Sequence, residues 1–188
     1  MRRMSLATKR ALATTLKQLM RGSPLREISV QMIAEQTGIS RHSFYYHFID
    51  KQDLVQWVFH SEVLDVVGRE EGGFLTQLSL IMSRMQMERN FYMRALEESG
   101  QNSFSDYLLE TVSQLCTKAL TADLPTEVVV DEKKIAQATR LGGLAIFGTL
   151  CDWVRDGLEA PPNEVLEPFE QMAGGLFSLV QSWLLQAD

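Results

Sequence analysis

The amino-acid sequence predicts an all-α fold, and three observations support this prediction. Apolar residues recur at intervals of three or four along most of the 188 residues, as on one face of a helix. Serine, aspartate and glycine residues at the ends of these segments are typical helix caps and stops. The three consecutive valines at 128–130 are too short a run to indicate a sheet.

The first helix is predicted between Ser5, a candidate N-cap, and Gly22, a stop, with leucines at positions 12, 16 and 19 on one face. Pro24 prevents this helix from continuing. The second helix is predicted to begin after its N-cap, Ser29, and to end at Gly38, since a residue without a Cβ adopts the left-handed conformation easily.

A third, short helix follows, with Ser40 as its cap and Phe44 and Phe48 as a buried stripe four residues apart. Two helices joined by a short turn that contains glycine form a helix-turn-helix, whose second helix enters the major groove of DNA. The rest of the third helix is polar or aromatic, namely Arg41, His42, Ser43, Tyr45, Tyr46 and His47. Arginine can donate two hydrogen bonds to guanine, and hydroxyl groups can bind phosphate oxygens. We therefore expect this face to meet double-stranded DNA, with at least two of the six residues serving packing alone.

The charge distribution favours the same interpretation. The whole chain has a formal net charge of -6 and a pI near 5.1. Residues 1–51, however, contain nine Lys or Arg and three acidic residues, whereas the other 137 residues contain nine and twenty-one. A basic N-terminal part can be attracted to phosphates while an acidic remainder is repelled by them. A chance cluster of solvated basic residues is the alternative.

The stretch ISVQMIAEQTGISRHSFYYHFIDKQDL, residues 28–54, resembles the DNA-binding signature of TetR-type transcriptional regulators, and the resemblance covers roughly residues 6–60. It implies an N-terminal DNA-binding domain over residues 1–50 and a helical effector-binding and dimerisation domain over 51–188. Positions that meet the phosphate backbone in the family are matched here by Ser29, Ser43, Tyr45, His47 and Lys51. Positions that face the groove are matched by Ser40, Arg41, His42 and Tyr46. His42 stands where many family members have a small residue, so their base contacts do not transfer directly.

A second resemblance is to a TetR subgroup that includes regulators of dihydroxyacetone kinase operons. It rests on the linker PLREI at 24–28, the aromatic YYHF at 45–48, WVRDG at 153–157 and the two prolines at 161–162. Effectors diverge within such subgroups, so this resemblance implies no particular effector.

Beyond residue 50 the apolar pattern predicts further helices only. Asp50 is the candidate cap of a long helix that connects the two parts and is predicted to reach the glycine pair at 72–73. Later helices are predicted at about 74–87, 88–98, 103–122, 131–155 and 163–186.

The last two of these helices are the predicted homodimer interface. Each contains a pair of interior glycines, and each glycine costs a helix about 1 kcal/mol relative to alanine. Close approach of another helix would compensate for this cost, and a dimer would present two recognition helices to one face of the duplex. The predicted interface residues are Gly142, Gly143, Phe147, Gly174, Gly175 and Phe177. Packing of these small residues within one chain is the alternative.

The middle helices are expected to enclose any pocket for a small-molecule effector, although an aromatic residue at helical spacing is more often core. The candidate lining residues are Phe91, Tyr92, Phe104, Tyr107, Cys116, Phe147 and Trp153. The two cysteines have neither metal-binding spacing nor the pattern of a disulfide framework, so we expect reduced thiols in a cytoplasmic protein without a cofactor or metal.

Two other classes of function compete with a regulator. An enzyme is disfavoured because the common catalytic and nucleotide-binding motifs are absent, and a metal site of Glu35, His42 and His47 is disfavoured because a five-residue spacing separates the histidines around the helix. A helical adaptor or co-activator that binds protein rather than an operator remains the alternative.

The sequence also lacks an apolar run long enough to span a membrane. We therefore predict a homodimeric, operator-binding transcriptional regulator, by default a repressor, that responds to a small molecule or a protein.

Overall fold

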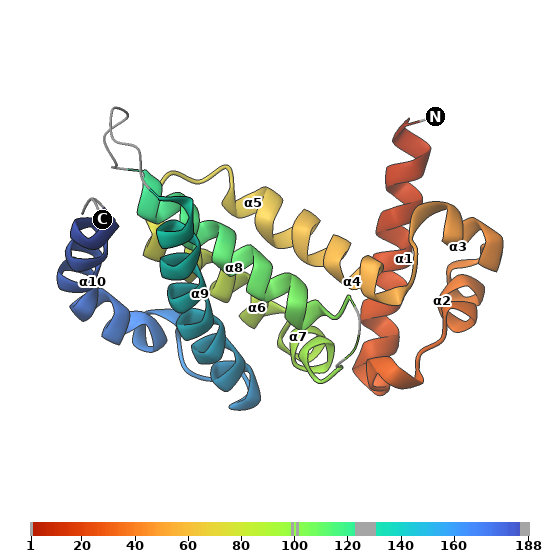
Figure 1. Cartoon of the computed structure of the whole chain (residues 1–188). Helices are drawn as coiled ribbons and strands as arrows, with labels where there is room; N and C mark the ends of the chain where they lie inside the picture. Colours follow the sequence, from red (N-terminus) through yellow and green to blue (C-terminus); the bar gives the residue numbers. More distant parts are fainter. Residues whose placement is uncertain (1, 99, 101, 123–130, 185–188) are drawn as a thin grey trace.

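The computed structural model describes residues 2–98, 100, 102–122 and 131–184, and within them the side chains outside 2–5, 173–174, 176–179 and 181. Every regular element in this described part is helical, which confirms the predicted all-α fold (Figure 1). The elements are α1 (Arg2–Gly22), η1 (Leu25–Glu27), α2 (Val30–Thr37), α3 (Arg41–His47), α4 (Lys51–Phe59), η2 (His60–Leu64), α5 (Asp65–Val67), α6 (Phe74–Met87), α7 (Arg89–Leu96), α8 (Phe104–Thr121), α9 (Glu132–Arg155) and α10 (Pro162–Leu184).

Helices α1, α2 and α3, together called the head, lie at one end of the molecule (Figure 1). Helix α1 packs against α2 and α4. Its buried residues include Leu12, Leu16 and Met20. The helix begins at Arg2, so Ser5 lies inside α1 and the prediction that it caps the helix is wrong. No proline or glycine occurs between Arg2 and Ser5, and nothing in the sequence therefore ends the helix at Ser5.

A long helical segment connects the head to the rest of the chain. Its N-cap is Asp50, as predicted, because the Asp50 side chain accepts a hydrogen bond of 2.8 Å from the backbone N–H of Asp53. The segment is α-helical in α4, passes through a π-helical turn in η2 and ends with α5 at Val67. The sequence predicted an uninterrupted helix as far as residues 72–73. The π-helical turn and the earlier end were missed because neither changes the spacing of apolar residues enough to be recognised.

Helices α6 to α10, together called the body, form the larger part of the molecule. Helix α8 packs along α9, α10 packs against α6 and α9, and α7 lies between α9 and α1 of the head (Figure 1). The predicted ranges of the five helices agree with the described structure to within about two residues, the usual uncertainty of helix ends. The predicted end of the last helix, at about residue 186, lies outside the described residues.

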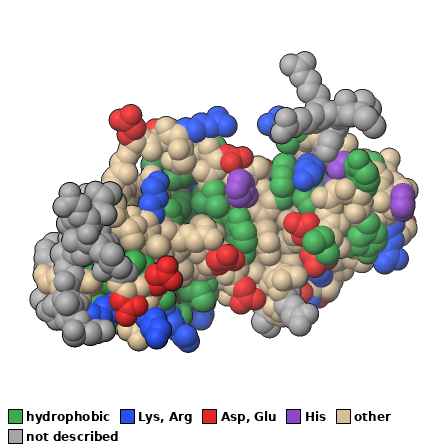
Figure 2. Space-filling model, turned by 45° about the horizontal axis from the view of Figure 1, so that its top comes forward, with side chains coloured by type: hydrophobic (Ala, Val, Ile, Leu, Met, Phe, Trp, Pro, Cys, Tyr) green, Lys and Arg blue, Asp and Glu red, His purple; other side chains and the backbone are tan. Residues whose placement is uncertain are grey.

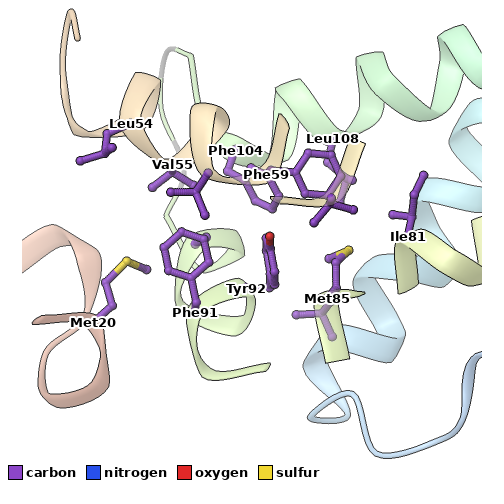
Figure 3. Close-up of a cluster of buried hydrophobic side chains, with 14 of the residues drawn as sticks. Met20, Leu54, Val55, Phe59, Ile81, Met85, Phe91, Tyr92, Phe104 and Leu108 are labelled. Atoms are coloured by element: carbon purple, nitrogen blue, oxygen red, sulfur yellow. The ribbon is translucent and has the colours of Figure 1, made fainter. Parts of the chain in front are cut away.

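The centre of the body is filled by aromatic side chains. The rings of Phe59 and Phe104 lie 5.2 Å apart, and the ring of Tyr92 lies 6.0 Å from Phe59 and 5.7 Å from Phe104 (Figure 3). All three side chains are buried. The two pairs made by Phe59 are edge-to-face, and such pairs each contribute about 0.5–1.5 kcal/mol beyond the burial of their surface. These three rings therefore pack α4 of the connecting segment against α7 and α8.

Candidate nucleic-acid interface

The turn between α2 and α3 has the geometry of a helix-turn-helix. The Ser29 hydroxyl caps α2 by accepting a hydrogen bond of 3.2 Å from the backbone N–H of Met32. Gly38 ends α2 with φ of 76°, a left-handed conformation that glycine adopts without steric cost. The Ser40 hydroxyl then caps α3 by accepting from the backbone N–H of Ser43 at 3.0 Å. These three positions were predicted from sequence, and the structure confirms the local roles of all three.

The inner face of α3 is anchored by two phenylalanines. Phe44 and Phe48 are buried, and their ring centroids lie 5.9 Å apart. Phe48 also packs against Trp57 of α4, with 5.9 Å between centroids, and the Lys9 ammonium lies 5.0 Å from the Phe48 ring centroid. Cation–π contacts of this type contribute about 0.5–1 kcal/mol at exposed sites. Helix α3 is therefore fixed against α1 and α4, and its opposite face is oriented outward.

The outer face of α3 carries Arg41, His42, Tyr45 and Tyr46, all exposed. Tyr46 is an aromatic residue, yet 79% of its surface is exposed to solvent. The Arg41 guanidinium donates a hydrogen bond of 3.2 Å to the Tyr45 hydroxyl and lies 5.5 Å from the Tyr45 ring centroid. Figure 2 shows basic and histidine side chains at the outer end of the head, on the right. Residues 36–49, which include the whole of α3, contain no acidic residue.

The remaining predicted contact residues lie around the same helix. Ser29 and Ser40 are exposed at the N-termini of α2 and α3, and their hydroxyls keep a proton free to donate while they cap. Ser43 and His47 are half-buried, and the His47 ring meets the Tyr46 ring edge-on at 5.2 Å. Eight of the nine predicted DNA-contact residues therefore lie on α3 or at the N-termini of α2 and α3.

Lys51, the ninth predicted contact residue, has three partners within the chain. Its ammonium donates to the backbone carbonyls of Leu25 at 2.7 Å and Ile28 at 3.2 Å, and it lies 3.8 Å from a carboxylate oxygen of Glu98. The side chain is only 22% exposed. Two of the three ammonium protons are thus donated to backbone carbonyls, and Lys51 holds the turn η1 in place. The phosphate contact that the resemblance implies for Lys51 stays a prediction.

A second lysine joins the head to the body and was not singled out from sequence. The Lys17 ammonium of α1 contacts Glu62 of η2 at 2.7 Å and Glu88, between α6 and α7, at 3.2 Å. Burial alone lowers the pKa of Lys17, but the hydrogen bonds and charges of the two glutamates outweigh it and raise the pKa above 10.5. The partners lie 45 and 71 positions away along the chain, so no local sequence signal identifies them.

Most residues predicted to line an effector pocket belong to the core. Phe91, Tyr92, Phe104 and Trp153 are at most 3% exposed, and the Trp153 indole donates to the Ala160 carbonyl at 2.8 Å. Tyr107 is half-buried against Phe59. Cys116 is also buried, and burial raises the pKa of its thiol to about 11. Phe147 does line a cavity, between α7 and α9. The spacing identified inward-facing residues correctly, but spacing does not distinguish a filled core from a cavity.

The predicted dimer residues divide into inward-facing and outward-facing positions. A Cβ on Gly143 would lie 2.5 Å from the Ser113 hydroxyl of α8, and one on Gly142 would lie 3.7 Å from the Cys116 sulfur. Gly143 thus permits α8 and α9 to approach within one chain, which favours the alternative of packing within the chain at this position. Phe147 likewise packs on the core. Gly175 faces open space, whereas Gly174 and Phe177 lie outside the described side chains.

Within the described residues, no helix combines the length and the apolar character that crossing a membrane requires.

Two family models match the chain. Residues 12–58 match the model described as "Bacterial regulatory proteins, tetR family", and residues 74–175 match the one described as "Transcriptional regulator C-terminal region". The first region contains the helix-turn-helix, and the second contains most of the body.

A curated relative is the "HTH-type dhaKLM operon transcriptional activator DhaS" of Lactococcus lactis subsp. lactis (strain IL1403). It is 25% identical over 92 residues, which are 48% of this chain and 49% of that protein. The chain thus matches about half the length of this curated relative.

Solved structures extend the likeness to nearly the whole chain. The "Dihydroxyacetone kinase operon activator DhaS" has a TM-score of 0.61 at 17% identity, covering 95% of this chain and 97% of that one. NalD, "the secondary repressor of MexAB-OprM multidrug efflux pump in Pseudomonas aeruginosa", has a TM-score of 0.56 at 18% identity, covering 89% and 95%. At these identities the structural likeness shows a shared fold.

Proposed function

Because the chain belongs to the TetR family of DNA-binding transcriptional regulators, we propose that it binds a two-fold symmetric operator in double-stranded DNA as a homodimer. Regulators of this family are in general transcription factors without enzymatic activity, and we propose no reaction for this chain. The cytoplasm, where operators are accessible, is the proposed location.

The observation that carries this proposal is the two-sided construction of α3. Phe44 and Phe48 fix one face to the head, and the opposite face presents Arg41, His42 and Tyr46 from a segment, 36–49, that contains no acidic residue. In the proposed complex the Arg41 guanidinium donates two hydrogen bonds to a guanine in the major groove, and the Tyr46 ring contacts neighbouring base edges. The serine hydroxyls at the two helix N-termini, together with Tyr45 and His47, hold the phosphates.

We propose that the dimer forms through the exposed faces of α9 and α10. Leu141 is 73% exposed and Met172 is 56% exposed, and Leu144 extends the same face of α9. A Cβ on Gly148 or Gly175 would meet nothing within 4 Å in the monomer, so a partner helix can approach closely at both positions. Exposed apolar surface of this extent favours association with a second chain. This interface replaces Gly143 and Phe147 by Leu141, Leu144 and Gly148.

The proposed direction of regulation is repression, relieved by a small-molecule effector that binds the body. NalD is named a repressor, whereas DhaS is named an activator, so both directions occur on this fold. A helix-turn-helix that occupies an operator blocks transcription when the operator overlaps a promoter. The adaptor hypothesis predicts no sequence-specific binding to DNA and is tested by the same experiment.

The test is selection of bound sequences from a random pool of duplexes by the purified protein at moderate salt. We expect enrichment of a motif with two inverted half-sites, their centres about 34 Å or more apart, because two recognition helices dock on one face of the duplex. A pool that stays random after several rounds, while the protein remains folded and dimeric, would refute operator binding and favour the adaptor.

A further inference from the structure

The joint between the head and the rest of the chain contains one cation between two carboxylates. The Lys17 ammonium lies 2.7 Å from a carboxylate oxygen of Glu62 and 3.2 Å from one of Glu88. We call these three residues the clamp. The Lys17 side chain is only 17% exposed. Because Lys17 is largely shielded from solvent, salt screens its interactions less than those of a surface ion pair.

The members of the clamp belong to three separate parts of the chain. Lys17 lies on α1 of the head, Glu62 lies in the π-helical turn η2 of the connecting segment, and Glu88 lies between α6 and α7 of the body. Long helices bend at π-helical turns, so the connecting segment can flex at η2. The Glu88 backbone is held in place, because its carbonyl accepts hydrogen bonds from the N–H groups of Phe91 at 2.9 Å and Tyr92 at 3.3 Å. A rotation of the head against the body therefore changes the distances within the clamp.

The two carboxylates of the clamp share one cation. Burial, and after it the charges of Glu62 and Glu88, raise the pKa of the Tyr92 hydroxyl, so both carboxylates act on the same buried side chain. Burial lowers the pKa of Lys17, but the hydrogen bonds and charges of the same two carboxylates outweigh it and raise that pKa. Like charges that share a site repel each other. The Lys17 ammonium offsets this repulsion only while α1 keeps its position.

The joint also contains apolar contacts. Helix α1 packs against α4 and α7, and Met20 of α1 and Phe91 of α7 are buried in the same core (Figure 3). Burial of apolar surface is non-directional, so it opposes separation of two helices more than rotation of one over the other. Charge-assisted hydrogen bonds are short and have a defined geometry. The clamp is therefore better suited than the apolar contacts to fix the angle between the head and the body.

This angle determines where the recognition helix lies. Helix α3 is anchored in the head by Phe44 and Phe48, so it moves together with α1. In the proposed homodimer a two-fold axis relates the two bodies, and the angle of each head sets the separation of the two α3 helices. One additional base pair between two half-sites moves one of them by about 3.4 Å along the duplex and turns it by about 35°.

We propose that the clamp sets the angle between the head and the body and thereby selects the spacing of the two half-sites in the operator. Lys17 is thus a positioning residue for DNA recognition, and it acts on the spacing rather than on the base sequence of a half-site. The inference rests on the proposed function, since it needs a homodimer that binds two inverted half-sites.

The angle is measured without DNA, by double electron–electron resonance between two spin labels. The labels are attached to Gln36→Cys in α2 and Glu110→Cys in α8, both exposed positions, in a chain without Cys116 and Cys151. Dilution with unlabelled protein isolates the distance within one protomer. Lys17→Met should raise the population of other head angles about fivefold and broaden the distance distribution, as for the loss of a partly shielded ion pair.

The matched control is Ile146→Val, which shortens a buried side chain of α9 outside the clamp. This change causes a similar loss of stability, so it shows what lower stability alone does to the joint. Its distance distribution should equal that of the parent. An unchanged distribution in Lys17→Met, or equal broadening in both variants, would overturn the inference.

The spacing is measured by titrating duplexes that carry the selected half-sites with the parental spacing or with one additional base pair. The clamp cannot contribute more discrimination than its own free energy, so Lys17→Met should reduce the preference for the parental spacing by about fivefold. Lys17→Glu combined with Glu62→Lys keeps one cation between two carboxylates and should recover most of the preference. Ile146→Val should keep the preference of the parent.

The same titrations separate the two proposals. A parent that selects no sequence at all refutes the proposed function. A parent that selects two half-sites, with a Lys17→Met variant that keeps the full preference for the parental spacing, refutes the clamp alone. A change in the half-site sequence that Lys17→Met selects would also refute it, because the clamp acts on spacing and not on base readout.

Discussion

Gly143→Leu is expected to destabilise the fold of the single chain rather than the dimer. A Cβ at position 143 would lie 2.5 Å from the Ser113 hydroxyl oxygen and 3.4 Å from the Ser113 Cα and Cβ, so α8 and α9 would have to separate. Overpacking of this kind costs typically about 1–3 kcal/mol, and the larger leucine belongs at the upper end. Replacing glycine in a helix interior returns about 0.8 kcal/mol. The expected net loss in the free energy of unfolding is therefore about 2 kcal/mol.

Gly148→Leu is the matched control, five residues further along the same helix. A Cβ at position 148 would meet nothing within 4 Å in the monomer, so the monomer should keep its stability while the dimer weakens. Urea denaturation measures the free energy of unfolding, and sedimentation at several concentrations measures association. Our assignment of the two faces of α9 is refuted if Gly143→Leu unfolds at the parent's urea concentration and sediments as a monomer, or if the two variants behave alike.

Three further predictions concern the charged contacts and the dimer. Lys17→Met should lower the free energy of unfolding by about 1 kcal/mol at neutral pH. The folded-state pKa of Lys17 is raised above 10.5, so this stabilisation is present below pH 10.5 and is lost as the pH rises through the folded pKa; parent and variant should then converge in urea titrations, and a constant difference would contradict the ion-pair assignment. Lys51→Met should cost about 1.5–3 kcal/mol, because two carbonyls lose a charged donor. Lys51→Met should leave the salt dependence of DNA binding unchanged. A slope smaller by about one in magnitude would show that Lys51 contacts a phosphate. Leu141→Glu should give monomers of normal helicity by sedimentation and circular dichroism, and an intact dimer would exclude this face of α9.

The local structure of the head followed directly from sequence. The caps Ser29 and Ser40, the left-handed Gly38 and the stripe of Phe44 and Phe48 each depend on partners no more than four positions away, so their roles are determined by local chemistry. The resemblance to the TetR family and to the dihydroxyacetone kinase subgroup is confirmed by the family models and by the likeness to DhaS.

Features that depend on distant residues did not follow from sequence. The carbonyls to which Lys51 donates lie 26 and 23 residues earlier in the chain, so the sequence around Lys51 did not identify them. Gly143 lies in a helix with an exposed apolar face and an inner face, and only the position of Ser113 shows which face it occupies. Most of the aromatic residues predicted to line a pocket fill the core instead, since whether rings meet one another or enclose a space depends on how the helices pack.

The most direct test of α3 as the recognition helix is titration of the selected operator and a scrambled duplex with the parent and with Arg41→Ala. Arg41→Ala should weaken operator binding by about 1–3 kcal/mol and binding to the scrambled duplex much less, because only the operator presents the matched acceptors. Arg69→Ala, which removes an exposed arginine outside the head, should change neither affinity. Equal weakening on both duplexes would make Arg41 a phosphate contact, and no weakening on either would show that α3 does not read DNA.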